Sequence, residues 1–355
     1  MDVTPLVGIL MYVIGGATGA SFYLPFKKVK DWAWESYWLV YCVAGLVVVP
    51  WALALAMSPN VLLVLGATPA KTLLLCYLFG AMWGAGGLTW GLMIRYLGVG
   101  LGIAIGCGLC AAVGTLVPPL VLGDFGQMVA KPGGMAALIA LLVGVVVSLG
   151  GIVVTGAAGM SKEREMSEEQ KKAAVAEFNF PKGIAIAIFS GVMSAGMAFG
   201  IRTAGEVIVP LTQKTQPVTS LLWQGLPGLV VVLLGGFTVN VVWCVMLNVR
   251  NRTAGDYSKA STPLVANYVL SALAGICWYS QMVFYTMGDS KIGAFKFSGW
   301  SVFMSSQIIF STLWGMALLE WKGTSPRTQK LLAAGLAVLV LSLVIIGYGN
   351  YLKPE

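Results

Sequence analysis

The sequence predicts an all-α integral membrane protein, with ten transmembrane helices arranged as two inverted five-helix repeats. Its 355 residues are 58% hydrophobic and only 10% charged, whereas about 25% of the residues in a soluble domain are charged. Ten long stretches contain no charged residue, and a weak repeat relates the second half of the chain to the first. The composition excludes a water-soluble domain, which could not cover its surface with so few charges.

The charge-free stretches set the number of helices. Each has at least 19 residues, and a helix needs roughly 20 apolar residues to cross a bilayer. Lipid offers the backbone no hydrogen-bond partner, so apolar runs of this length are expected to be helical. The ten stretches cover residues 3–26, 36–70, 72–94, 96–123, 132–161, 183–201, 215–249, 260–288, 297–319 and 331–352.

Small residues and prolines locate the helices of the first half. The first helix is rich in glycine, alanine and serine, which let helix backbones approach closely in lipid. Proline lacks the backbone donor that a helix needs, so Pro118-Pro119 is expected to end the fourth helix. The expected bounds are Leu6–Phe26 for the first helix, an end near Met57 for the second, Thr72–Ile94 for the third and Gly134–Gly156 for the fifth.

The second half repeats the first at an offset of 175 residues, which places Gly8 on Gly183 and Gly16 on Gly191. Five helices is an odd number, so the second copy is expected to lie upside down relative to the first, as in many secondary transporters. We therefore expect one repeat over 1–160 and the other over 183–355. Residues 161–182 carry many charges and are expected to form a solvated cytoplasmic linker.

Lysine and arginine indicate the orientation. The loops expected after helices 1, 3, 5, 7 and 9 hold 15 of the 22 basic residues. Because basic loops stay in the cytoplasm, both termini are expected on the opposite, periplasmic side. Lys27, Lys28 and Lys30 belong to this basic set, and we interpret them as topology determinants that contact anionic lipid headgroups, with a gating role as the alternative.

Several function classes find little support. The net charge of +8 comes from short loops, so it does not indicate nucleic-acid binding. Cys107 and Cys110 have the spacing of a metal or redox pair, but the chain has no histidine and no second pair, so we expect no metal and no cofactor. An intramembrane enzyme would need clustered acids or histidines. The sequence offers none, and we expect no catalytic residues.

The stretch Trp278–Trp300 is the densest collection of polar and aromatic groups within the apolar sequence. We interpret it as the end of one helix, a turn at Gly288–Gly293 and the start of the next. Trp278, Tyr279, Gln281 and Trp300 can stack on a polar solute or hydrogen-bond to it. A carboxamide inside a helix needs a partner or a wet cavity, and for Gln281 we favour the cavity over an interhelical hydrogen bond.

Six short stretches resemble the bacterial L-rhamnose–proton symporters, which belong to the drug/metabolite transporter superfamily. The resemblance extends over nearly the whole chain, in order and with similar spacing. The stretches are Phe26-Lys-Lys-Val-Lys-x-Trp-x-Trp-Glu35, Phe79-Gly-Ala-Met-Trp-Gly84, Arg95-Tyr-Leu-Gly98, Ser194-Ala-Gly-Met197, Trp278-Tyr-x-Gln281 and Glu320-Trp321. The resemblance implies ten helices in two inverted repeats, and a bacterial inner-membrane carrier that takes up a deoxy-sugar with protons.

Some positions depart from the family pattern. The family has asparagines and a tyrosine near residues 86–90, where this chain has Gly87, Thr89 and Trp90. It has an acidic residue at the position of Lys296 and a histidine near Phe303. Lys296 either lines the cavity, where it would bind an anionic substrate or replace a coupling cation, or snorkels to the membrane boundary. The substrate-binding candidates are Trp83, Thr89, Trp90, Trp278, Tyr279, Gln281, Lys296 and Trp300.

Proton coupling needs a group that titrates within the pathway. By the expected helix bounds no acidic residue lies at mid-bilayer, and Glu35, Glu206 and Asp289 come nearest, each at a helix end. Glu35 and Asp289 are the coupling candidates, each with an interfacial or salt-bridging role as the alternative.

The sequence thus predicts a secondary active transporter that imports an L-rhamnose-like sugar by alternating access, with the proton as its second partner and the lipid bilayer as its surroundings. Two alternatives remain open at this stage. One is a carrier of the same fold for an anionic metabolite such as a sugar acid, and the other is an uncoupled facilitator.

Overall fold

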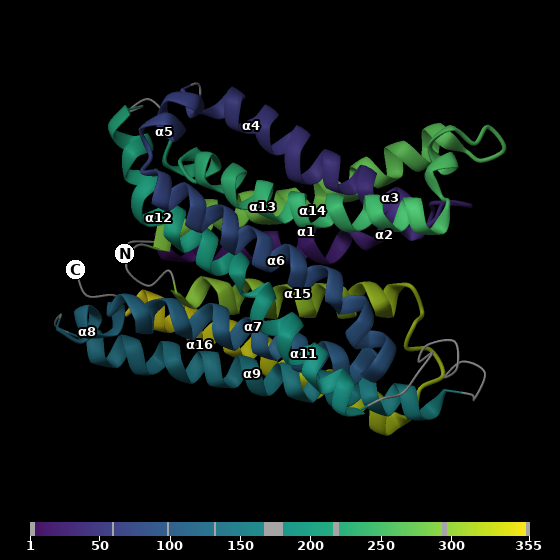
Figure 1. The fold of residues 1–355 in the computed structure, drawn as a ribbon. Helices are drawn as coiled ribbons and strands as arrows, with labels where there is room; N and C mark the ends of the chain where they lie inside the picture. Colours follow the sequence, from purple (N-terminus) through teal and green to yellow (C-terminus); the bar gives the residue numbers. More distant parts are fainter. Residues whose placement is uncertain are drawn as a thin grey trace.

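The computed structural model describes residues 4–58, 60–97, 99–130, 133–166, 180–215, 220–292 and 297–352. These residues form helices and short connections, without a β-strand among them, and most of the long helices run side by side (Figure 1). The first half contains α1 (Thr4–Ser21), α2 (Tyr23–Phe26), α3 (Trp34–Cys42), the π-helix η1 (Val43–Val48), α4 (Val49–Met57), α5 (Val61–Ala67), α6 (Ala70–Leu97), α7 (Val99–Leu122), α8 (Asp124–Val129) and α9 (Gly134–Glu165).

The second half contains the same kinds of element. They are α11 (Phe180–Ser194), α12 (Gly196–Thr215), the 3₁₀-helix η2 (Leu221–Trp223), α13 (Leu226–Asn251), the 3₁₀-helix η3 (Ala254–Ser258), α14 (Leu264–Ile292), α15 (Phe297–Ala317) and α16 (Pro326–Tyr351).

Nine helical segments within the described residues are long and apolar enough to cross a membrane. They correspond to nine of the ten charge-free stretches, so the prediction of an all-α, multi-pass membrane protein is confirmed. The tenth stretch forms α15, which has 21 residues, or about 30 Å at 1.5 Å per residue. Its length suits a crossing, but its serines and a glutamine keep it outside the nine segments that are apolar enough by composition.

Two predicted helix ends are wrong. Pro118 and Pro119 lie inside α7, which continues to Leu122, and membrane helices tolerate proline where neighbouring groups compensate the freed carbonyls. The turn expected to begin at Gly288 is also absent, because α14 continues to Ile292. Gly288 instead packs closely against the ring of Tyr12 in α1. The rest of the expected turn, residues 293–296, lies outside the described residues.

The helix expected to end near residue 201 is longer than predicted. It is interrupted at Ala195 and then continues as α12 to Thr215. Glu206 therefore lies inside a helix, and not at a helix end. Arg202 lies one turn before it, and its Nε is 3.0 Å from Oε1 of Glu206. This pairing explains why the helix can include both charges, since spacing of four residues places opposite charges side by side.

Each half packs mainly against the other. Helix α1 packs against α14 and α15, and α11 packs in the same way against α6 and α7. The last long helices of the two halves, α9 and α16, form an extensive contact with each other and lie at the lower edge of Figure 1. These reciprocal contacts place residues from both halves around the middle of the bundle.

Glycine allows the closest helix crossing, between α6 and α13. A Cβ atom on Gly80 would collide with the carbonyl oxygen of Val232, and one on Gly235 would collide with that of Tyr77. Backbones that approach this closely gain van der Waals contact, which drives helix association in lipid.

Gly80→Leu is therefore expected to destabilise the protein by at least the roughly 1–3 kcal/mol typical of overpacking. The loss would be measured as a lower melting temperature of the purified, detergent-solubilised protein. Gly150→Leu on α9 is the matched control, because Gly150 is exposed and a Cβ there meets no atom within 4 Å. Equal melting temperatures of the two variants would contradict the proposed crossing.

Candidate functional site

A pair of stacked tryptophans joins the two halves. The rings of Trp83 in α6 and Trp278 in α14 lie 4.8 Å apart between centroids, at an interplanar angle of 27°. Trp278 is buried and meets Tyr41 edge-on at 6.3 Å, whereas Trp83 is half-buried. Indole faces suit the apolar face of a sugar ring. In this conformation the two rings cover each other, so a sugar would stack on the uncovered face of Trp83 or between separated rings.

Open space lies beside Trp83 on the same face of α6. Trp83, Gly87 and Trp90 are spaced four and three residues apart, so they share one face of the helix. A Cβ atom on Gly87 would meet no atom within 4 Å. The indole nitrogen of Trp90 donates a hydrogen bond of 3.0 Å to Oγ of Ser194. Two half-buried indoles therefore flank a gap above Gly87.

Thr89 does not face an open site with a free hydroxyl. Its Oγ1 lies 2.8 Å from the carbonyl oxygen of Gly86 and 3.2 Å from that of Ala85. Both carbonyls belong to its own helix, an arrangement in which threonine satisfies its donor locally. The structure thus separates Thr89 from the other candidates on α6.

Two carboxamides meet at α1. Gln281 in α14 is only 1% exposed, so it does not face lipid. A Cβ on Gly19 would collide with Oε1 of Gln281 and would lie 3.2 Å from Nε2 of Gln307 in α15. Amides both donate and accept hydrogen bonds, so this pair can bind sugar hydroxyls. The neighbouring Tyr279 is buried too, and its hydroxyl has no hydrogen-bond partner within the described part of the chain.

Asp289 is held by a tyrosine that sequence reasoning missed. The hydroxyl of Tyr12 in α1 donates a hydrogen bond of 2.5 Å to Oδ1 of Asp289. Tyr12 is fully buried, and its ring fits against Gly288 and Gly299, where any side chain would collide with it. The available signal was a phenol in the middle of the small and apolar residues that form α1.

An aromatic cluster connects Tyr12 to Trp300. The rings of Tyr12 and Tyr285 are 5.1 Å apart, and those of Tyr285 and Trp300 are 5.4 Å apart. The indole nitrogen of Trp300 donates to the carbonyl oxygen of Cys110 at 3.2 Å. Trp300 is buried, so its ring packs between α15 and α7, and its one donor is already used.

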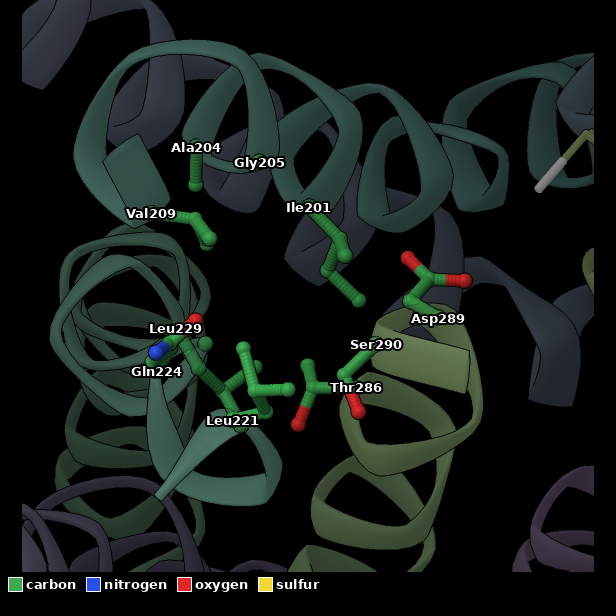
Figure 2. A pocket seen from close by; sticks show the side chains of 11 residues that line it. Ile201, Ala204, Gly205, Val209, Leu221, Gln224, Leu229, Thr286, Asp289 and Ser290 are labelled. Carbon is green, nitrogen blue, oxygen red and sulfur yellow. The ribbon is translucent and has the colours of Figure 1, made fainter. Parts of the chain in front are cut away.

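A small pocket lies next to Asp289 (Figure 2). Asp289, Thr286 and Ser290 line it from α14, opposite Ile201 of α12 and Gln224, which precedes α13. Its volume is about 40 Å³, which suits one or two water molecules at roughly 30 Å³ each. Ligand pockets are several hundred Å³. The pocket can therefore bring water to the Asp289 carboxyl, but it cannot hold a sugar.

Glu35 has a different environment, toward the opposite end of α14. It is 5% exposed, and its Oε1 accepts hydrogen bonds from Nδ2 of Asn251 at 2.9 Å and from Oγ1 of Thr253 at 2.8 Å. These contacts tie the start of α3 to the end of α13. The structure therefore does not bring the two coupling candidates together. Lys296 lies outside the described residues.

Comparison with known proteins identifies the family. The family model described as "L-rhamnose-proton symport protein" matches residues 1–351. The chain belongs to this family. The L-rhamnose-proton symporter of Cronobacter sakazakii is 37% identical over 348 residues, covering 97% of each chain. Those of Salmonella enteritidis and Yersinia pestis are 36% and 34% identical over 348 and 349 residues, covering 97% of this chain and 97% and 98% of their own. As a member of the L-rhamnose-proton symport family, the protein is a membrane transporter and not an enzyme.

The stretches that resemble the L-rhamnose-proton symport family meet in the folded chain. Phe79–Gly84 and Trp278–Gln281 supply the stacked indoles, and Ser194–Met197 contains the interruption between α11 and α12. Lys27, from the first stretch, and Glu320, from the last, form an ion pair of 2.5 Å. A second ion pair joins Nη2 of Arg202 to Oδ2 of Asp124 at 2.7 Å. The sequence did not predict it, because the two residues lie 78 positions apart.

Proposed function

We propose that this protein imports L-rhamnose, or a closely related deoxy-sugar, together with protons across the bacterial inner membrane. The observation that carries the proposal is the end-to-end likeness to L-rhamnose-proton symporters, at 37% identity over 348 residues. Likeness over the whole length includes both halves of the bundle, and not only one shared motif.

We propose ten crossings, with α15 as the one that composition alone does not identify, in two inverted repeats at 1–160 and 183–355 joined by a cytoplasmic linker at 161–182. The reciprocal packing of α1 and α11 supports the repeat. So do the interruptions of the first helix of each half, at Phe22 and at Ala195. With the basic loops in the cytoplasm, both termini are periplasmic.

The sugar site in this proposal lies between α6, α14 and α1. Trp83, Trp278 and Trp90 offer indole faces beside the open space at Gly87, and Gln281 offers an amide to sugar hydroxyls. Aromatic faces with a few polar groups are the usual composition of such sites. The contact between the stacked indoles supports a closed conformation, in which the sugar has yet to separate them.

Asp289 is the coupling residue in this proposal. It accepts a hydrogen bond from a buried phenol and also lines a water-sized pocket, so a proton can reach its carboxyl. An ionisable group within a membrane helix is a functional candidate by default. Glu35, by contrast, accepts hydrogen bonds from the amide of Asn251 at the end of α13 and from the hydroxyl of Thr253, which favours a structural role.

Uptake by the purified protein in liposomes tests the function. An inward proton gradient is expected to drive accumulation of labelled L-rhamnose, and dissipating the gradient with a protonophore is expected to stop it. Equilibration of L-rhamnose without accumulation would indicate an uncoupled facilitator. The absence of any L-rhamnose flux would contradict the proposal.

A sugar acid is the second candidate substrate. This chain has Lys296, and it has Gly87, Thr89 and Trp90 where the family has asparagines and a tyrosine. Both differences favour a carrier with an anionic substrate. Competition between labelled L-rhamnose and an excess of unlabelled sugar acid separates the candidates. Under the first proposal the acid competes weakly. Strong competition that Lys296→Met abolishes would favour the second.

A further inference from the structure

Among the residues that the structure describes, two ion pairs join the two halves of the chain. Lys27, which directly follows α2, pairs with Glu320 after α15, and Arg202 in α12 pairs with Asp124 at the start of α8. Each pair thus combines a base near the first helix of one half with an acid that follows the fourth helix of the other half.

The repeat relates these pairs to each other. Arg202 lies 175 positions after Lys27, which is the offset that aligns Gly8 with Gly183. Both bases follow the interruption in the first helix of their half. Both acids directly follow a residue with left-handed backbone, Gly123 at φ 73° and Leu319 at φ 59°. The two acids, Asp124 and Glu320, lie 196 positions apart, so they share the left-handed turn and their place after a fourth helix, while only the bases share the offset of the repeat.

The pairs lie at opposite ends of the bundle. Figure 1 shows α2, which ends at Phe26, at the right end, and α8, which begins with Asp124, at the left end near both termini. Each pair therefore connects the halves at one membrane face. With both pairs formed, the halves are tied at both faces, in keeping with a pocket of only about 40 Å³ beside Asp289.

We propose that the two ion pairs are alternating gates: Arg202–Asp124 closes the face that holds the termini, and Lys27–Glu320 closes the opposite face. The inference rests on the proposed alternating-access function. An open path to one side requires one pair to break while the other holds. Because the pairs are related by the repeat, the same contact is made and broken at each face in turn.

The two gates differ in strength. The side chains of Arg202 and Asp124 are 25% and 15% exposed, and those of Lys27 and Glu320 are 50% and 44% exposed. Exposed pairs contribute little because water and salt screen them, and breaking a partly buried pair leaves a charge in poorer solvent. Loss of Asp124 is therefore expected to shift the conformational balance more than loss of Glu320.

Cysteine accessibility tests the gates without any substrate. Ser290→Cys places a thiol in the pocket that Asp289 and Ile201 also line, where its labelling reports access from solution. The half-buried Cys277 is replaced by alanine in the same protein, so that it does not react. A membrane-impermeant maleimide is added from the side of the termini. Asp124→Asn is expected to raise the labelling rate several-fold, and Glu320→Gln is expected to lower it below that of the parent. These opposite directions are the signature of alternation.

Glu206→Gln is the matched control. It removes the other carboxylate beside Arg202, which lies on the same helix and does not join the halves, so its labelling is expected to equal that of the parent. The double variant Arg202→Asp with Asp124→Arg, made in the Glu206→Gln background so that the exchanged carboxylate meets no like charge, is expected to restore the parent rate. Labelling that rises in both Asp124→Asn and Glu320→Gln, or that the double variant fails to restore, would overturn the gates.

The outcome is separable from that of the proposed function. If the parent protein carries no L-rhamnose but the two variants still shift labelling in opposite directions, the proposed gating role of the ion pairs is supported and the proposed substrate is wrong. If L-rhamnose uptake is intact and the labelling rates do not move, the gates are wrong and the function stands. Should Asp124→Asn fail to purify as a monodisperse protein, Arg202→Gln breaks the same pair and has the same expected labelling.

Discussion

Asp289→Asn is expected to abolish proton-driven accumulation of L-rhamnose, to the level of empty liposomes, while exchange of labelled for unlabelled sugar continues. Asparagine retains the size of the side chain and can still accept the hydrogen bond from Tyr12, but it cannot bind and release a proton. Exchange needs only the loaded carrier to reorient, so it does not require the carboxyl. Uptake driven by an imposed inward proton gradient and counterflow without a gradient measure the two properties in the same vesicles.

Two further variants test whether proton coupling depends on the Tyr12–Asp289 contact or on Glu35. Tyr12→Phe keeps the ring between Gly288 and Gly299 and removes only the donor to Asp289. Hydrogen bonds to charged groups contribute about 1.5–3 kcal/mol, so we expect accumulation to weaken and not to disappear. If Glu35→Gln abolished accumulation and Asp289→Asn left it unchanged, the coupling site would lie at the other end of α14.

Gly87→Leu is expected to reduce L-rhamnose uptake and counterflow together to near background. The leucine side chain would occupy the open space between Trp83 and Trp90, where a Cβ at present meets no atom within 4 Å. A sugar that stacks on these indoles then has no room, because apolar side chains do not yield to a rigid ring without strain. Initial rates over a range of sugar concentrations measure the loss.

The chain offers matched controls for this prediction. Gly150→Leu makes the same change at an exposed position of α9 where a Cβ also meets no atom within 4 Å, so it tests the general effect of an added side chain on a membrane helix. Gly87→Asn introduces an amide of the kind the family has nearby, and it is expected to retain uptake. Normal uptake by Gly87→Leu would exclude this face of α6 from the sugar site.

Much of the architecture could be predicted because the bilayer imposes a simple rule. An apolar run of the right length without charges becomes a helix, whatever its neighbours are. The wrongly predicted helix ends lie where contacts with other residues determine whether the helix continues. Pro118 and Pro119 remain helical within α7, and Gly288 continues α14 because Tyr12 packs against it. Arg202 and Glu206 stay in a helix because they pair with each other.

The candidate site was less predictable. The stretch Trp278–Trp300 stood out by its density of polar and aromatic groups, and Trp83 stood out by its place in a family stretch. Tyr12 did not, because its role depends on Asp289, 277 positions away. The ion pair of Arg202 with Asp124 likewise depends on a contact between the halves that no local pattern encodes.

The sequence alone determined that this protein is a multi-pass helical membrane protein of the L-rhamnose-proton symport family, because hydropathy and family stretches are local properties of the chain. Only the tertiary structure decided which polar groups meet. It placed Trp83 on Trp278, Tyr12 on Asp289, and Glu35 beside Asn251 and Thr253 at the end of α13. The physical reason is that buried polar groups are satisfied by whatever partner packing brings within hydrogen-bond distance, and packing between distant helices is a property of the whole fold.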